Sequence, residues 1–72
     1  MEKFKLDGRE FIELNNLLKI QSWVESGGRA KVLIGEGQVK VNGKVELRKR
    51  CKIQSGMTVE FMEQKVEVVG NI

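Results

Sequence analysis

The hydrophobic residues of this chain change their spacing along its length, and each spacing predicts a different element. Near the start, Phe4 and Leu6 alternate with lysines before an Asp-Gly pair, which is typical of a short strand that enters a tight turn. The next apolar residues recur at helical spacing: Phe11, Leu14, Leu17 and Leu18. They predict a first helix over roughly residues 12–20, although no common N-cap residue precedes it.

A second helix is predicted over roughly residues 27–36. Ser26 is a favourable N-cap, because its hydroxyl can accept a hydrogen bond from a free N–H group of the first turn. The apolar residues that follow at helical spacing are Ala30, Leu33 and Ile34. Gly37 is placed to end the helix in a left-handed conformation. Gly27 and Gly28 lie in the first turn and leave the backbone there uncovered.

From residue 38 onward the hydrophobic period is two, as in strands. The pair Asn42-Gly43 lies between two alternating runs, which is a strong hairpin signal because both central residues of a type I′ turn need positive φ. Alternation predicts one core-facing set of apolar residues: Val39, Val41, Val45 and Leu47. If the second strand stays regular, the opposite face carries Lys40, Asn42, Lys44, Arg48, Arg50 and Lys52.

Two more alternating runs, around Val59–Phe61 and Val66–Val68, predict the last strands, with a turn at 54–56 and a loop over 62–65. The order of elements predicts an α+β fold, in which two short helices pack on a small, mostly antiparallel sheet of about four to five strands. The 72 residues allow one domain, which we place at 1–72.

Composition argues against an enzyme. The chain has no histidine and one cysteine, so it lacks the commonest general base, cannot form an intrachain disulfide and offers no set of metal ligands. No phosphate-binding glycine motif is present, and we expect no cofactor. No apolar run is long enough to span a bilayer, and the charged N-terminus does not resemble a signal peptide. We therefore expect a cytoplasmic protein without a membrane partner.

Cys51 is the one candidate nucleophile. Its neighbours Arg50 and Lys52 could lower the pKa of its thiol and make it reactive. The favoured interpretation is a small, partly buried side chain in a basic segment.

The positive charge is concentrated in one third of the chain. Between Arg29 and Lys52 there are eight Lys and Arg residues against two Glu, whereas the remainder has five basic and eight acidic residues. A positive face of this kind favours a polyanionic partner over an ordinary solvated surface.

Two segments could hold the polyanion. The segment 26–31 offers the free N–H groups of a helix N-terminus together with Arg29, although a plain N-cap with a solvated arginine explains it equally well. The hairpin and the run after it carry a row of polar and basic residues, for which charged edge protection is the weaker explanation: Lys40, Asn42, Lys44, Arg48, Lys49, Arg50 and Lys52.

The aromatic residues narrow the class of polyanion. Phe4, Phe11 and Phe61 occupy core positions of the pattern, so only Trp23 remains for stacking, and no aromatic residue is expected on the basic surface. Trp23 is better explained as a cap on the core between the helices than as a ligand-stacking residue. This favours structured RNA or a duplex, read by shape and phosphates, over an extended single strand.

Taken together, these segments resemble the α-L RNA-binding motif, typified by the fourth protein of the small ribosomal subunit. The resemblance covers residues 4 to 69, with a motif core at about 12–62, and is closest to the small stand-alone bacterial YbcJ-like family. It rests on Ser26-Gly27-Gly28-Arg29-Ala30-Lys31, on the tract 36–43, on the run 46–53 and on Gly56 before Thr58-Val59-Glu60.

The resemblance implies that the second helix and the adjoining hairpin bind structured RNA, often ribosomal or transfer RNA, without catalysis. Larger domains of this type often have a serine–arginine pair at Gly27-Gly28, so here only the backbone of Gly28 can serve. The implied RNA-facing residues are Gly28, Arg29, Lys31, Lys40, Asn42, Lys44, Arg48, Lys49, Arg50 and Lys52. We expect a monomer associated with RNA or the ribosome; the alternative is a module that docks an acidic, ribosome-associated protein.

Overall fold

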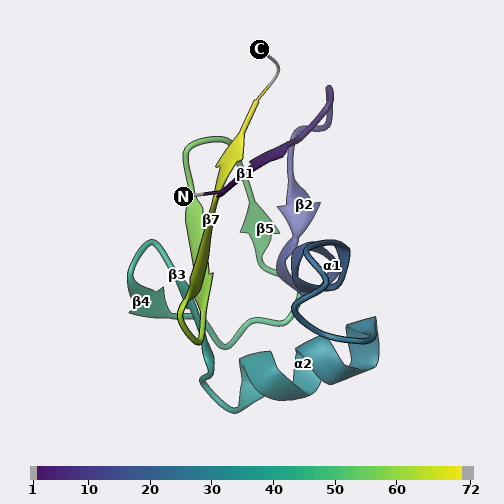
Figure 1. Ribbon diagram of the computed structural model, residues 1–72, viewed down its shortest axis with the longest axis vertical. Helices are drawn as coiled ribbons and strands as arrows, with labels where there is room; N and C mark the ends of the chain where they lie inside the picture. The colour runs from purple at the N-terminus through teal and green to yellow at the C-terminus, as the bar shows by residue number, and fades with distance from the viewer. Residues whose placement is uncertain (1, 71–72) are drawn as a thin grey trace.

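Five strands form one sheet, in the order β1-β7-β6-β3-β4, in the computed structural model, which describes residues 2–70 (Figure 1). They are β1 (Glu2–Lys5), β3 (Val39–Val41), β4 (Lys44–Val45), β6 (Thr58–Phe61) and β7 (Gln64–Val69). Neighbouring strands are antiparallel except β1 and β7, which run parallel. A separate antiparallel pair joins β2 (Ile12–Glu13) to β5 (Lys52–Ile53).

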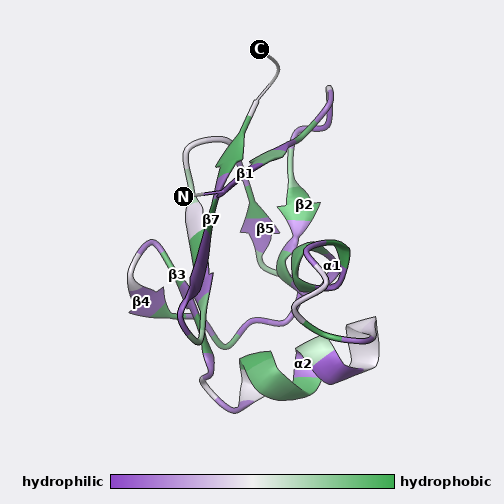
Figure 2. Cartoon of the chain, in the orientation of Figure 1, coloured by the Kyte–Doolittle hydropathy of each residue, from purple (hydrophilic) through white to green (hydrophobic). Residues whose placement is uncertain are grey.

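The helices α1 (Leu14–Ile20) and α2 (Gly27–Gly35) lie next to each other beside the sheet (Figure 1). The hydrophobic side chains of both helices and of the inner strands form one core (Figure 2). Its fully buried members include Leu14, Leu17, Leu18, Ile34, Ile53, Val39, Val59, Val66 and Val68. The predicted α+β fold, with two helices and a mostly antiparallel sheet, is therefore confirmed.

Helix α1 begins at Leu14, two residues later than predicted. Ile12 and Glu13 instead pair with β5, and Ile12 takes the buried position that the pattern had given to Phe11. As expected, no side chain caps the helix. Backbone carbonyls from a distant segment do so: the N–H of Leu14 donates to Cys51 O at 2.9 Å, and that of Asn15 donates to Lys49 O at 3.1 Å.

Helix α2 follows its prediction closely. The hydroxyl of Ser26 accepts a hydrogen bond from the N–H of Arg29 at 3.1 Å, which is the expected N-cap. Gly37 follows the helix with a φ of +79°, in the left-handed region that glycine tolerates.

The turn of the β3–β4 hairpin is as predicted, but its faces are not. Asn42 and Gly43 have positive φ angles of 53° and 83°. Because this turn has two residues, Val41 pairs with Lys44 and Lys40 with Val45. Directly paired residues share a face, so the odd and even positions exchange faces across the turn. Val45 is consequently not a core residue, with an exposed fraction of 53%, and Leu47, which follows the end of β4, is also exposed, at 59%.

Two further predictions about the C-terminal half need correction. The second hairpin strand does not continue to Lys52, because β4 ends at Val45 and the chain is irregular until β5. The expected loop over 62–65 is a tight turn at Met62 and Glu63, since β7 already begins at Gln64. Within residues 2–70, none of the helices has the length and apolar character needed to cross a membrane.

Candidate nucleic-acid interface

The basic loop, defined here as residues 48–52, has a fixed backbone and exposed cations. Cys51 anchors it, because its side chain is buried in the core. The carbonyls of Lys49 and Cys51 hold the first turn of α1, and Lys52 begins a strand paired with β2. The four cationic side chains point to solvent: Arg48, Lys49, Arg50 and Lys52. The loop therefore presents charge from a backbone that does not need to be ordered on binding.

Three of the four cations of the basic loop line a hollow. Its volume is about 510 Å³, and it is lined by Arg48, Arg50, Cys51, Lys52, Gln54 and Met57. A concave surface lined by one sign of charge concentrates the electrostatic field more than a flat surface does. The hollow can thus attract an anion such as a phosphate group.

Arg48 differs from the other cations of the basic loop because its side chain forms a close ion pair with Glu46. Its Nε lies 3.0 Å from Glu46 Oε2 and its Nη2 lies 3.1 Å from Oε1, while its backbone N–H donates to the same carboxylate at 2.9 Å. These hydrogen bonds lower the pKa of Glu46 from 4.5 to about 2. Much of the charge of Arg48 is thereby compensated within the protein.

Among the described residues, the remaining cations of the basic loop have only a distant ion-pair partner or none. The Nε of Arg50 lies 4.0 Å from Glu13 Oε1, and both side chains are exposed. Within residues 2–70, no acidic side chain comes within 4.0 Å of Lys49 or Lys52. The Nζ of Lys52 lies 5.0 Å from the ring centroid of half-buried Phe11. The expectation that no aromatic residue adjoins the basic surface was therefore wrong.

The structure does not support a reactive thiol at Cys51. Burial and the neighbouring Glu46 carboxylate raise the pKa of the thiol, despite the opposing effect of Arg48. The sulfur lies 3.5 Å from Arg48 Nη2 and 3.6 Å from Glu46 Oε1. Cys51 is an anchor of the loop. Among the described residues, no cluster of three metal-ligating side chains is present.

Helix α2 places its two cations on different flanks. Lys31 and Gly35 are one turn apart and share a flank, and a Cβ added at Gly35 would lie 3.5 Å from Lys49 Cε. Lys31 thus extends the surface of the basic loop. Arg29 shares the other flank with Leu33, where both line a separate groove. Gly28 is exposed, and a Cβ added there would meet only Ser26 Oγ, at 3.8 Å.

The hairpin cations do not form one row. Lys40 and Lys44 are both exposed, but the register places them on opposite faces. Asn42 also has a structural role: its Oδ1 accepts a hydrogen bond from Thr58 N at 2.9 Å, and its own N–H donates to Thr58 O at 2.8 Å. The predicted residues therefore form three groups, namely the basic loop with Lys31, the hairpin, and Arg29 at the start of α2.

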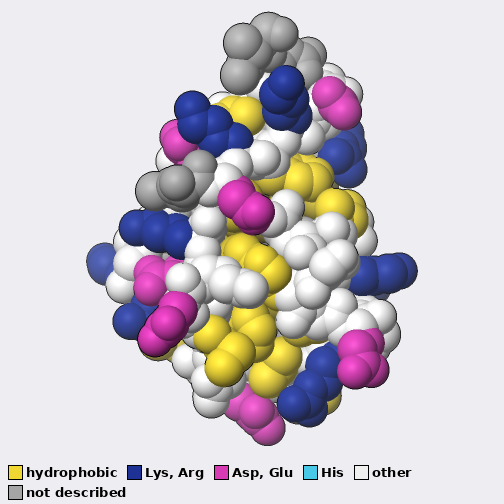
Figure 3. Space-filling model, viewed as in Figure 1, with side chains coloured by type: hydrophobic (Ala, Val, Ile, Leu, Met, Phe, Trp, Pro, Cys, Tyr) yellow, Lys and Arg dark blue, Asp and Glu magenta, His cyan; other side chains and the backbone are white. Residues whose placement is uncertain are grey.

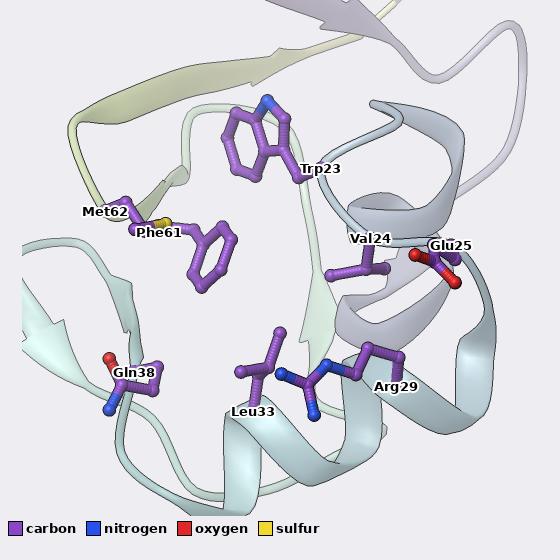
Figure 4. A pocket seen from close by; sticks show the side chains of 8 residues that line it. All are labelled: Trp23, Val24, Glu25, Arg29, Leu33, Gln38, Phe61 and Met62. Carbon is purple, nitrogen blue, oxygen red and sulfur yellow. The ribbon is translucent and has the colours of Figure 1, made fainter.

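A second hollow, here called the apolar groove, was not found from the sequence. Its volume is about 340 Å³, and it is lined by Trp23, Val24, Glu25, Arg29, Leu33, Gln38, Phe61 and Met62 (Figure 4). In the view of Figure 3, hydrophobic side chains form a patch between the sheet and the helices. Helical spacing in the sequence places Arg29 and Leu33 on the same flank of α2. No local sequence pattern predicts that Phe61 lies close to Trp23.

Comparison with known proteins gives three findings. A family model described as the S4 domain matches residues 4–69. A protein of Escherichia coli (strain K12) named "Putative RNA-binding protein YbcJ" is 54% identical over 69 residues, which cover 96% of this chain and 99% of that protein; a YbcJ protein of Shigella flexneri matches equally. The solution structure of E. coli YbcJ, described as revealing an α-L motif involved in RNA-binding, matches with a TM-score of 0.73 over 96% of this chain and 87% of that one.

Proposed function

Because the chain belongs to the S4 domain family, we propose that it binds structured RNA, such as ribosomal or transfer RNA, through the basic loop, α2 and the β3–β4 hairpin. In this proposal the protein is a non-enzymatic, cytoplasmic monomer that acts on RNA or on the ribosome. The E. coli relative carries a name that describes RNA binding, and its structure is described in the same terms, which supports the general function.

The observation that carries the proposal is the hollow of the basic loop. Three cations, Arg48, Arg50 and Lys52, line one concave surface whose backbone is fixed by α1 and β2. Phosphate groups bind such a surface because each neutralised phosphate releases a condensed counterion. Arg50 adds a planar fork of donors that suits two phosphate oxygens. Arg48 contributes less charge, because Glu46 already pairs with it.

The other groups extend the surface along an RNA. Lys31 lies on the flank of α2 that meets Lys49, so it can reach a phosphate next to the one in the hollow. Lys40 and Lys44 offer charge from the hairpin, and the turn at Gly43 is open, with no atom within 4 Å of an added Cβ. A rigid set of cations at several points favours a folded RNA, whose phosphates have fixed spacing.

The test compares two triple variants with the same loss of charge. Changing Lys49, Arg50 and Lys52 to alanine should weaken binding of an RNA hairpin by more than about tenfold. The slope of log K against log salt should also flatten by about 0.7–0.9 for each phosphate that the variant no longer neutralises. The matched control changes Lys3, Lys5 and Lys65, which are exposed on β1 and β7.

Two outcomes would contradict the proposal. Equal weakening by the two folded variants would mean that bulk charge alone matters. Tighter binding of polyglutamate than of any RNA hairpin, abolished in the basic-loop variant, would indicate instead an acidic protein partner. Circular dichroism and urea unfolding check that both variants remain folded.

A further inference from the structure

The apolar groove points to a ligand that the basic surface alone does not explain. We propose that it holds one unpaired nucleobase of the bound RNA, an inference that rests on the proposed function. The groove lies on the opposite flank of α2 from Lys31 and the basic loop, and Arg29 stands at its rim. An RNA that contacts α2 can therefore place its phosphates on one side of the helix and a base on the other.

The walls of the groove are suited to a flat aromatic ligand. Trp23, Val24 and Leu33 are half-buried side chains packed on the core, each with one part exposed to the groove. In Figure 4, Val24 and Leu33 point toward the ring of Phe61, and the indole of Trp23 closes the space above it. The two rings lie 6.4 Å apart at an angle of 32°. Bases of any sequence stack on such surfaces, because every base has a π-face.

Polar groups at the rim suit the rest of a nucleotide. The Arg29 guanidinium lies beside Leu33 at one end of the groove, and the Gln38 amide lies at the other (Figure 4). Glu25 also lines the groove, but within residues 2–70 no acidic side chain comes within 4.0 Å of Arg29, so the guanidinium can still bind a phosphate. An amide both donates and accepts hydrogen bonds, which lets Gln38 contact the polar edge of a base.

A nucleobase explains this combination better than an apolar side chain of a protein partner does. The volume of about 340 Å³ lies at the lower end of the range for small-molecule sites, roughly 300–1,000 Å³. An aliphatic side chain would pack on the apolar walls of the groove but would not interact with the charge of Arg29. A nucleotide uses the walls for its base and Arg29 for its phosphate.

Trp23 provides a direct readout, because it is the only tryptophan of the chain and there is no tyrosine. Stacking of a base on the indole should quench its fluorescence. The probes are RNA hairpins with a single-nucleotide bulge of A, C, G or U. The controls are the same hairpin with an abasic ribose at the bulge, which keeps the backbone charge, and the fully paired hairpin.

We expect at least one bulged hairpin to bind more tightly than its abasic counterpart, by between about 5-fold and about 150-fold, and to quench Trp23. Gln38→Ala and Met62→Ala remove exposed side chains at the rim, so both variants should fold. They should reduce the preference for a base without changing affinity for the abasic hairpin. Trp23→Phe, which retains an aromatic face, should keep most of that preference.

The outcomes separate this inference from the proposed function. If all hairpins, including the abasic one, bind with equal affinity and leave Trp23 unquenched, the groove does not hold a base, although RNA binding stands. Quenching by a short apolar peptide but by no hairpin would assign the groove to a protein partner and overturn the inference. If no hairpin binds at all, the proposed function fails as well.

Discussion

The β3–β4 hairpin and the basic loop are close in sequence and both basic, but their conformations depend on different contacts. In the hairpin turn, Asn42 and Gly43 adopt positive φ angles, as the Asn-Gly pair predicts, and two hydrogen bonds join Asn42 to Thr58 of β6. The basic loop has no such local signal. Apart from one turn hydrogen bond of its own, from Cys51 N to Arg48 O at 3.2 Å, the loop is held by contacts with residues more than thirty positions earlier in the chain, at the start of α1 and in β2.

This difference explains where the positive charge is concentrated. The hairpin places Lys40 and Lys44 on opposite faces of a two-strand edge. The basic loop gathers Arg48, Arg50 and Lys52 around one hollow, because Cys51 and Ile53 are buried on either side of Lys52. A concentrated positive site therefore arises where a charged segment is attached to the core, and not where the charge pattern alone is most regular.

The prediction with the largest expected effect removes one apolar side chain from each region. Ile53 is fully buried in β5, whereas Val45 is 53% exposed in β4. Ile53→Ala should reduce the free energy of unfolding by about 2–5 kcal/mol, because it leaves a cavity beside the basic loop. Val45→Ala should change it by about 0.5 kcal/mol or less. Urea unfolding measures both; similar losses would mean that the hairpin is attached to the core as firmly as the loop.

The same distinction describes what the sequence could predict. The spacing of Leu14, Leu17 and Leu18, the N-cap at Ser26 and the Asn-Gly turn are local patterns, and each element that they predicted is present. The predicted faces failed where a local rule was extended too far. Across a two-residue turn the parity changes, so Val45 is exposed instead of buried, and Leu47 is exposed because the strand ends before it.

The arrangement of the candidate site could not be predicted from the sequence. Charge clustering identified the cations, yet the pairing of Arg48 with Glu46 and the contact of Lys52 with Phe11 depend on how the chain turns after β4. The apolar groove depends on β6 meeting the segment between the helices. Trp23 and Phe61 are far apart in the sequence, and no pattern of spacing relates them.

A second prediction tests how much the hairpin turn depends on the positive φ of Gly43. Gly43 has a φ of +83°, and an added Cβ would meet no atom within 4 Å. Gly43→Ala should therefore lower stability by about 1–2 kcal/mol through backbone strain, without any clash. Gly28→Ala is the matched control, because Gly28 lies in a helix where an added Cβ would make only an ordinary contact with Ser26 Oγ, at 3.8 Å, and alanine there should stabilise by about 0.4–1 kcal/mol. Thermal unfolding that moves in the same direction for both variants would contradict this interpretation of the turn.

The smallest expected effect concerns the ion pair at the entrance to the basic loop. The bonds from Arg48 hold the pKa of Glu46 at about 2 in the folded protein, below its ordinary 4.5. A pKa that is lower in the folded state means that the carboxylate stabilises the fold fully above about pH 5, and that this contribution is lost as the pH falls toward about 2. Glu46→Gln should therefore reduce stability at pH 7, by no more than about 1 kcal/mol because the side chain of Arg48 is 76% exposed.

The difference in stability between the wild-type protein and Glu46→Gln should shrink steadily from pH 5 to pH 2, as measured by urea unfolding at each pH. Glu63→Gln, in the exposed turn between β6 and β7, is the control; within residues 2–70, no cation lies within 4.0 Å of this carboxylate. The same substitution at Glu46 releases the charge of Arg48 beside the hollow. It should therefore tighten RNA binding while it weakens the fold, and the charge-matched Glu63→Gln should tighten it less. Equal RNA affinities for the two variants would mean that Arg48 is no freer without Glu46, and that the pair does not limit the positive charge of the basic loop.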